Sequence, residues 1–301
     1  MIGLLADDLH GMPARMSDDG DQPTRQEAEQ LLRSGLAKAM RETAAQYSVP
    51  LAWVYADQGR PVVPSNGSAF LLDCGEGPFL VTADHVLAGF LKDKADHADA
   101  KAILGETVIP LDERIIARDR AHDVATLRVT AVEVADLKRY GKVPLTGSQS
   151  KWPPAPPCVD RGVFFVGFPG GEGRKVEWKG GGRVDIEFEA YTALAVASSV
   201  SATGLSLLFE HEQSFDAGLR PRMPTRDNMG GCSGAPILTF VEQRRVFSWR
   251  LGGVVNEAVD GLVKAARADC INPDGTLNAH PDPLAYRRDR DLSAWEEGQS
   301  S

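Results

Sequence analysis

The pattern of apolar and polar residues divides the chain into one helical stretch and a longer region of strands. Between residues 25 and 47, apolar side chains recur every three or four positions, as they do on one face of an α-helix. Thr24 and Glu27 form the pattern of a capping box at its start. We expect the apolar face of this helix to pack on the rest of the chain. It comprises Ala28, Leu32, Leu36, Ala39, Met40 and Tyr47.

From residue 51 onward the apolar runs are short and typical of β-strands. The stretch GSAFLLDCGEGPFLVTADHV has two apolar runs around a glycine-containing turn, which predicts a hairpin. In RVDIEFEA, apolar and charged residues alternate, as in a strand with one buried face. The uncharged run 191–209 holds seven Ser, Thr or Gly residues and is flanked by Glu189 and Glu210. It predicts two strands around the turn SATG, not a transmembrane helix.

A proline-rich stretch at residues 144–160 interrupts the strands and predicts a linker between two mainly antiparallel β halves. Five segments are therefore expected. They are a disordered N-terminal segment at 1–23, a helix at 24–48, a first β half at 49–150, a second β half at 151–271 and a C-terminal tail at 272–301.

Composition and charge narrow the possible functions. The chain has 301 residues, a net charge of −9 and no dense run of Lys and Arg, so a nucleic-acid-binding surface is not expected. Asp7 and Asp8 interrupt the apolar core that a secretory signal needs, which predicts a cytoplasmic protein without a membrane anchor. The scattered cysteines form no CxxC pair and predict reduced thiols, not a metal site or a disulfide framework. They are Cys74, Cys158, Cys232 and Cys270.

A serine among glycines is the strongest sign of chemistry in the chain. In NMGGCSGAPIL, Ser233 lies on permissive backbone just before an apolar run. A serine hydroxyl acts as a nucleophile only with a base within hydrogen-bond reach and an acceptor that orients the base. His85, at the end of the run FLVTADH, and Asp123, which follows His122 and precedes VATLRV, are the candidates. The other histidines lie in terminal or charged segments: His10, His97, His211 and His280.

Three motifs, in this order, resemble those of the chymotrypsin/trypsin-like serine peptidases of the bacterial, cytoplasmic type. VTADHV resembles the histidine motif, HDVATLRV the aspartate motif and GGCSGAP the serine motif of that family. The resemblance covers about residues 50–270. It implies a mainly β fold of two antiparallel β-barrels, here with an added N-terminal α-helix.

The resemblance also implies a role for each residue. Ser233 would attack the scissile carbonyl, His85 would take and return the proton, and Asp123 would orient the imidazole. The backbone N–H groups of Gly231 and Ser233 would bind the developing oxyanion. The expected protein is a serine endopeptidase that acts on a protein or peptide through an acyl-enzyme, without cofactor or metal. Because an unregulated peptidase would damage a cytoplasm, we expect control by a partner or pathway, for example in stress response or phage defence.

Four further residues bear on the substrate. Asp227 lies six residues before Ser233, where trypsin-like enzymes carry the acidic residue of their specificity pocket, and this predicts cleavage after Arg or Lys. The alternative is a solvated loop aspartate paired with its neighbour in the chain. On a later strand, the family's mode of binding implies backbone pairing with an extended peptide. The residues expected there are Val255, Asn256 and Glu257.

Two residues depart from the family pattern. Cys232 precedes the serine where trypsin-like digestive enzymes have an aspartate that pairs with a new N-terminus, so activation by N-terminal insertion is not expected. Its side chain should face away from Ser233 and not compete as a nucleophile. Asp84 precedes His85 where alanine is usual. On a strand end its side chain should point away from the histidine.

Other classes of protein remain as alternatives. Ser233, Asp260 or Asp269, and His280 follow the chain order of α/β-hydrolases, but a proline and a strand-like run follow the serine where a helix is needed. A zinc hydrolase lacks its HExxH motif. Taken singly, the three motifs also fit a loop serine, a surface histidine and a turn aspartate. The rival from another functional class is a binding module in which misaligned triad residues hold a peptide or a partner.

Overall fold

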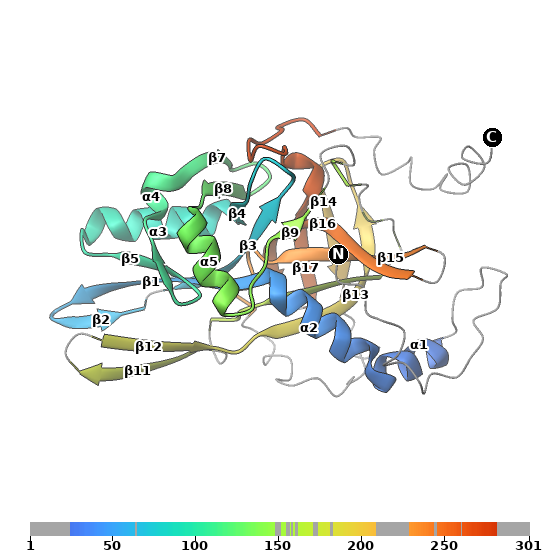
Figure 1. The fold of residues 1–301 in the computed structure, drawn as a ribbon, viewed down its shortest axis with the longest axis horizontal. Coiled ribbons are helices and arrows are strands. Elements are labelled where there is room, and N and C mark those ends of the chain that lie inside the picture. The colour runs from blue at the N-terminus through green and yellow to red at the C-terminus, as the bar shows by residue number, and fades with distance from the viewer. Residues whose placement is uncertain are drawn as a thin grey trace.

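The computed structural model is a mainly β protein with helices at its N-terminus and two β halves (Figure 1). The residues whose structure is described are 25–63, 65–147, 152–154, 157, 159, 162–170, 174–180, 183–208, 229–243, 246–259 and 261–281. Several features of the sequence lie outside them: the predicted disordered segment with the capping residue Thr24, Cys158, His211, Asp227, Asp260 and the tail beyond residue 281.

The N-terminal helix is interrupted, whereas the sequence predicted one continuous helix. α1 (Arg25–Leu31) and α2 (Ala37–Tyr47) are joined by the π-helical segment η2 (Leu32–Leu36). Within that segment Gly35 has a φ of 124°, which glycine adopts at little cost, and the helix kinks there. Most of the predicted apolar face packs inward. The members that contact the core are Leu32, Leu36, Met40 and Tyr47.

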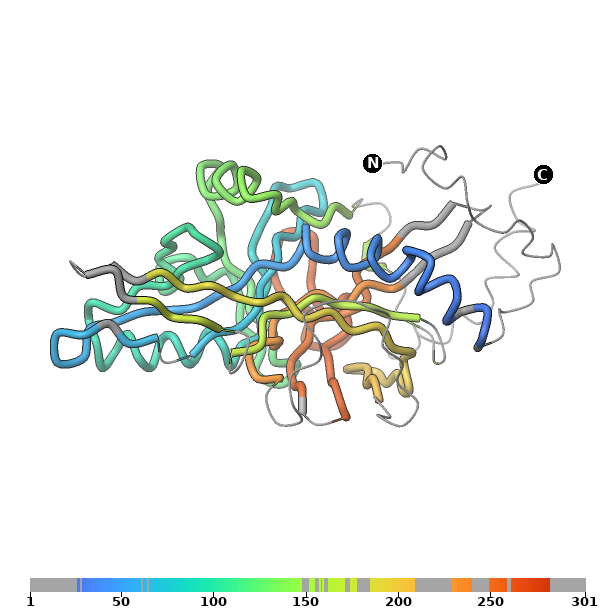
Figure 2. Tube along the Cα trace, turned by 90° about the horizontal axis from the view of Figure 1, so that it is seen from below, coloured from blue at the N-terminus to red at the C-terminus, as the bar shows by residue number. Residues whose placement is uncertain are grey.

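α2 lies against both β halves: it runs along the second half and ends near their junction, where β1 begins (Figures 1 and 2). Met40 belongs to a core cluster that also contains Phe70 of the first half and Phe164 of the second. At its C-terminal end, Tyr47 Oη accepts a hydrogen bond from Trp249 Nε1 at 3.3 Å. The helix therefore fastens the two halves to each other.

The first half is a nine-stranded, mainly antiparallel sheet. Its hydrogen-bonded order is β6-β5-β1-β3-β4-β8-β7, with β2 paired to β1 and β9 to β3. Over the described residues the edge strands β6 and β7 do not pair with each other, so this half is a half-barrel, consistent with the predicted two-barrel fold. The strands are β1 (Ser48–Asp57), β2 (Arg60–Val62), β3 (Asn66–Asp73), β4 (Phe79–Thr82), β5 (Lys101–Leu104), β6 (Thr107–Ile109), β7 (Ile115–Asp119), β8 (Val124–Arg128) and β9 (Leu145–Thr146). The helices are α3 (Asp84–Asp96), α4 (Leu111–Arg114) and α5 (Ala131–Arg139).

The central hairpin of this half was predicted from sequence and is confirmed. β3 and β4 pair antiparallel, with Leu71 opposite Leu80. Successive side chains of β3 enter different cores, because residues of a strand alternate between its faces. Phe70 enters the core shared with the second half, and Leu71 enters the core of the first half alone. β4 leads after one residue into the 13-residue helix α3, where the sequence predicted only a short helical turn.

The second half is a closed barrel of six strands in the order β10-β13-β14-β17-β16-β15. β13 and β14 form the predicted hairpin around SATG, and no helix of the described residues is long and apolar enough to cross a bilayer. A separate two-stranded ribbon, β11-β12, extends from this half alongside the first (Figures 1 and 2). The strands are β10 (Gly162–Gly167), β11 (Arg174–Gly180), β12 (Arg183–Phe188), β13 (Tyr191–Val200), β14 (Gly204–Leu208), β15 (Pro236–Gln243), β16 (Val246–Val259) and β17 (Leu262–Arg267), followed by the 3-10 turn η4 (Ala268–Cys270).

Candidate active site

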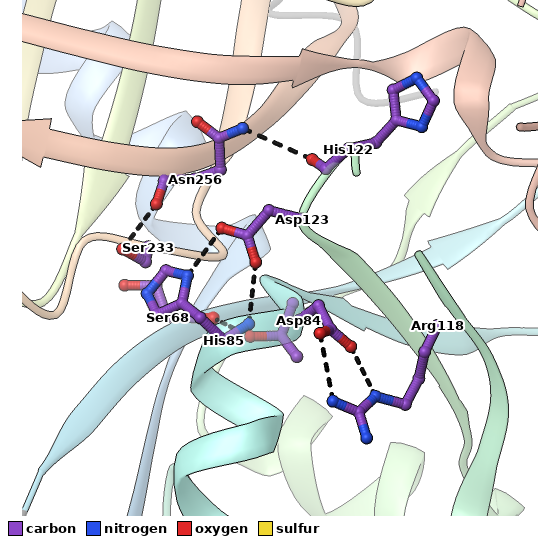
Figure 3. Close-up of polar contacts among 9 residues, drawn as sticks. Ser68, Asp84, His85, Arg118, His122, Asp123, Ser233 and Asn256 are labelled. Atoms are coloured by element: carbon purple, nitrogen blue, oxygen red, sulfur yellow. Dashed lines mark hydrogen bonds and ion pairs between the residues drawn. The ribbon is translucent and has the colours of Figure 1, made fainter. Parts of the chain in front are cut away.

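His85 and Asp123 meet in the first half, at the ends of two neighbouring elements. His85 is the second residue of α3, and Asp123 directly precedes β8. The Asp123 carboxylate accepts two hydrogen bonds from His85, one from the backbone N at 2.8 Å and one from ring Nδ1 at 2.7 Å (Figure 3). A carboxylate is an acceptor only, so Nδ1 carries the proton and Nε2 of the neutral ring is left as an acceptor.

The backbone at Asp123 adopts an uncommon conformation that a contact from the second half supports. Asp123 has a φ of 55°, in the left-handed region that aspartate tolerates better than most residues. The preceding residue, His122, accepts a hydrogen bond through its carbonyl from Asn256 Nδ2 at 3.4 Å. Asn256 also accepts from Ser233 Oγ at 3.3 Å through its own carbonyl. This residue therefore connects the loop of the serine with the loop of the aspartate (Figure 3).

Ser233 lies in the second half, three residues before β15, in a loop pressed against β3. Its carbonyl accepts a hydrogen bond from Ser68 N at 2.7 Å. Gly67 passes between the serine and the start of α3: a Cβ there would lie 3.2 Å from the Ser233 carbonyl and 2.6 Å from Val86. Gly234 packs tightly against β3: a Cβ at this position would overlap the Ser68 carbonyl oxygen. Its φ of 92° also favours glycine, so the glycine after the serine is required by space and by conformation.

The orientation of two peptide units in the serine loop exposes two N–H groups. The Gly230 carbonyl accepts from Gly170 N at 2.7 Å, and the Cys232 carbonyl accepts from Ala235 N at 3.0 Å. In a planar trans peptide the C=O and the following N–H point in opposite directions. The N–H groups of Gly231 and Ser233 therefore point away from these partners, and neither has a hydrogen-bond acceptor within the described part of the chain. Two free N–H groups side by side are suited to an oxyanion.

The hydroxyl of Ser233 donates to the Asn256 carbonyl, and among the described contacts it makes no hydrogen bond to His85. Figure 3 shows the serine and the imidazole together on the same side of Asp123. Rotation about the serine Cα–Cβ bond changes the partner of a hydroxyl without moving the backbone. Such contacts are often long or unformed without substrate and tighten in the complex.

Asp84 lies next to His85 but bonds elsewhere. Its carboxylate accepts from Arg118 Nε at 2.5 Å and from a second guanidinium nitrogen at 3.1 Å. The expectation that it points away from the histidine is met, but the reason differs: Asp84 begins a helix and does not end a strand. The pKa of His85 is raised chiefly by its hydrogen bond to Asp123. Partial burial opposes this increase, and the charges of Asp123 and Asp84 add to it.

Cys232, the other potential nucleophile of this loop, has an unreactive thiol. Its side chain is fully buried, and burial raises the pKa of its thiol to about 12. Because the thiolate is the reactive form, this cysteine is a poor nucleophile near neutral pH. The described cysteines Cys74, Cys232 and Cys270 are all free and buried. No group of three His, Cys, Asp or Glu side chains within the described segments is placed to hold a metal ion.

The three predicted peptide-pairing residues differ in which of their backbone groups the protein itself already uses. Val255 donates its N–H to the Ala235 carbonyl at 2.9 Å, and its carbonyl accepts from Gly234 N at 2.6 Å. Its N–H is therefore used within the protein, whereas its carbonyl oxygen keeps a second lone pair, so pairing of Val255 with a peptide stays a prediction. β15 pairs with β16 only as far as Val254, and β17 covers the other edge. Asn256 and Glu257 therefore have one edge on which no strand of the described residues lies.

Two further predictions concern residues that are engaged elsewhere or not described. Asp227 lies outside the described residues, so the structure does not place the predicted pocket. Asp269 pairs with Arg267 inside the second half, and His280 is exposed, so the described residues do not assemble the α/β-hydrolase triad. Sequence reasoning missed two side chains of β3: Ser68, which donates to Gly231 in the serine loop, and Asn66, which donates to Phe168 beside it. The only sequence signal was their place just ahead of an apolar run.

Two antiparallel β halves, with a histidine and an aspartate on one and a serine on the other, define the class of the chymotrypsin-like serine peptidase folds. The family model of the trypsin-like peptidase domain matches residues 67–246, more than half of the chain. The chain therefore belongs to the trypsin-like peptidase family, as its motifs predicted.

Other comparisons add little. No curated protein matches the chain closely enough to be counted as a relative. One solved structure, from work on the coupled folding and binding of the intrinsically disordered Sesbania mosaic virus VPg protein, matches with 13% sequence identity and a TM-score of 0.35. The match covers 73% of this chain and 91% of that one. So distant a likeness does not bear on function.

Proposed function

We propose that the protein is a serine endopeptidase that hydrolyses peptide bonds through Ser233, His85 and Asp123. The observation that carries the proposal is the combination of an oriented imidazole with two free N–H groups in the serine loop. Nδ1 of His85 is held by Asp123 at 2.7 Å, which leaves Nε2 to accept a proton. A binding protein has no need of both features, whereas acyl transfer needs each of them.

The chemistry follows from these positions. The Ser233 hydroxyl turns from the Asn256 carbonyl to Nε2, gives up its proton and attacks the scissile carbonyl carbon. The carbonyl oxygen becomes an oxyanion and accepts hydrogen bonds from the N–H groups of Gly231 and Ser233. His85 then donates the proton to the leaving amine, and the C–N bond breaks to leave an acyl-serine. Water, deprotonated by the same imidazole, releases the acid and restores the serine.

A fluorophosphonate probe tests the proposal directly. It phosphonylates a serine only where the hydroxyl is activated and an oxyanion site is formed. The purified protein should gain the mass of one probe, and Ser233→Ala should gain none. Cys232→Ala is the matched control because it changes the adjacent residue without touching the predicted nucleophile, and it should label like the unchanged protein. Absence of labelling in the unchanged protein, or labelling that survives Ser233→Ala, would contradict the proposal.

A second candidate function is a peptide- or protein-binding module with an inactive site. The observation that favours it is the Ser233 hydroxyl, which donates to Asn256 and not to His85. The two candidates differ in what survives substitution. A module should bind its peptide equally well in His85→Ala and Ser233→Ala, and the unchanged protein should release no cleavage products. Control by a protein partner is compatible with both.

Cleavage after Arg or Lys is a finer proposal that rests on Asp227 and on the family resemblance alone. Its position six residues before the serine would place a carboxylate at the base of the specificity pocket, where it would pair with a basic side chain. In a peptide library, the unchanged protein should cleave after Arg and Lys, and Asp227→Ala should lose that preference. An unaltered cleavage preference in the variant would show that Asp227 is a solvated loop residue.

A further inference from the structure

Two buried polar side chains at the start of β3 contact the loop that carries Ser233. Ser68 Oγ donates to the Gly231 carbonyl at 2.7 Å and accepts from Phe168 N at 3.1 Å. Ser68 is wholly buried, at 0% exposure. A hydroxyl has a single proton, and the Ser68 hydroxyl donates it to the Gly231 carbonyl.

The neighbouring side chain holds the other end of the same peptide segment. Asn66 Nδ2 donates to the Phe168 carbonyl at 2.7 Å, and Asn66 is 7% exposed. Side chains of β3 therefore hold both the N–H and the C=O of Phe168. Two residues further on, Gly170 N donates to the Gly230 carbonyl. β3 is thus connected to the serine loop twice, directly at Gly231 and indirectly through the 168–170 segment.

These contacts fix the orientation of the peptide between Gly230 and Gly231, which decides whether the Gly231 N–H can bind an oxyanion. If the peptide between Gly230 and Gly231 turned over, the Gly230 carbonyl would point to where the Gly231 N–H now points. It would leave Gly170 N without its acceptor, and an unpartnered polar group inside a protein is costly. The same groups enclose Gly231, since a Cβ there would lie 2.6 Å from Asn66 Nδ2 and 2.8 Å from Gly170 N.

We propose that Asn66 and Ser68 are positioning residues that hold the oxyanion N–H of Gly231 in its reactive orientation. They form a bracket, Asn66–Ser68, that acts through Phe168, Gly170 and Gly231 and touches no reacting atom. The proposal rests on the proposed function, because an oxyanion site has meaning only for acyl transfer. Under this proposal, side chains of the first half fix the conformation of the serine loop, although Ser68 and Gly231 are 163 residues apart in the chain.

The test compares a transition-state analogue with a ground-state ligand. A peptide trifluoromethyl ketone adds to the serine as a tetrahedral oxyanion, whereas the corresponding peptide amide only occupies the site. Loss of one oxyanion donor typically lowers turnover by about 10²–10³-fold. Ser68→Ala should therefore lower kcat and the affinity for the ketone together, by about 100-fold, with KM and the affinity for the amide changed less than about threefold. Asn66→Leu, which keeps the volume but removes the donor, should change them in the same direction.

Thr126→Val is the matched control for a merely structural effect. Thr126 is also wholly buried, and its hydroxyl donates to a backbone carbonyl, that of Gly275, at 2.5 Å far along the chain. It should lower thermal stability about as much as Ser68→Ala but leave the ratio of the two affinities unchanged. If Ser68→Ala does not fold, Asn66→Leu carries the same comparison.

The outcomes separate this inference from the proposed function. If the unchanged protein is labelled by the fluorophosphonate and both bracket variants keep the affinity ratio, the bracket is only structural and the peptidase proposal stands. If the affinity ratio falls in Thr126→Val as well, the effect is general and the positioning role is refuted. If the unchanged protein is not labelled, the proposed function and the bracket fail together.

Discussion

Replacing Asp123 by asparagine is expected to lower kcat/KM for peptide hydrolysis by about 10⁴-fold, the loss typical of this change in a serine–histidine–aspartate triad. The carboxylate accepts from both the backbone N and ring Nδ1 of His85. An amide has a single acceptor oxygen, so one of the two His85 nitrogens must face the NH₂ group. The backbone N–H can only donate and keeps the oxygen, so the NH₂ group faces Nδ1. Nδ1 must then accept, the ring proton moves to Nε2, and Nε2 can no longer accept from Ser233. Steady-state kinetics on a cleaved peptide measure the loss.

The same variant should move the pH profile in a defined direction. Catalysis needs a neutral His85, and its hydrogen bond to Asp123 is the largest cause that raises its pKa above 6.5. In the unchanged protein kcat/KM should therefore rise with a midpoint above pH 6.5, and in Asp123→Asn the midpoint should move to lower pH. Asp84→Asn is the control, because the charge of Asp84 also raises the pKa of His85, but less than Asp123 does, and Asp84 makes no hydrogen bond to the imidazole. It should shift the midpoint downward slightly and keep most of the activity.

A loss smaller than about tenfold in Asp123→Asn would contradict the assigned roles, as would an unmoved midpoint. The first result would mean that something other than Asp123 orients the imidazole. The second would mean that the measured step does not depend on the protonation of His85. In either case the protein would still be a peptidase, but not one that works through the Asp123–His85 pair in the roles proposed here.

The sequence could predict what depends on short stretches of chain. The β3–β4 hairpin and the β13–β14 hairpin follow from apolar runs around a turn, and both are present. The three motifs predicted the family, since each is a local arrangement of a functional residue and its strand. The kink at Gly35 could not be read from the helical pattern, because a single glycine within a helix is compatible with a straight helix as well.

The contacts that complete the site join residues far apart in the chain. Asn256 and His122 are 134 residues apart, and no periodic pattern encodes their hydrogen bond. The contacts of Val255 could not be predicted for the same reason. Its backbone N–H is used by the turn that follows Ser233, and only the folded arrangement of β16 beside that turn shows it. The pairing of Asp84 with Arg118 likewise depends on α3 and β7 lying together.

The largest effect on stability is expected at a charged pair inside the second half. Arg267, at the end of β17, is 0% exposed and pairs with Asp269. The guanidinium also donates to the carbonyls of Ser201 and Ala202 at 3.0 and 3.1 Å, in the turn between β13 and β14. One buried cation therefore connects two turns, and its partner Asp269 lies two residues further along the chain.

Asp269→Asn is expected to lower the free energy of unfolding by about 3–5 kcal/mol, the usual cost of removing one partner from a buried ion pair. The amide occupies nearly the same space as the carboxylate, so packing changes little and the loss reports the removal of the Asp269 charge beside Arg267. Glu257→Gln, in an ion pair between β16 and β17, is the matched control. Glu257 and Lys264 form an ion pair at 2.6 Å, but their side chains are 49% and 50% exposed. Its loss should cost no more than about 1 kcal/mol. Urea denaturation of the three proteins measures both differences, and equal losses in the two variants would show that water reaches Arg267.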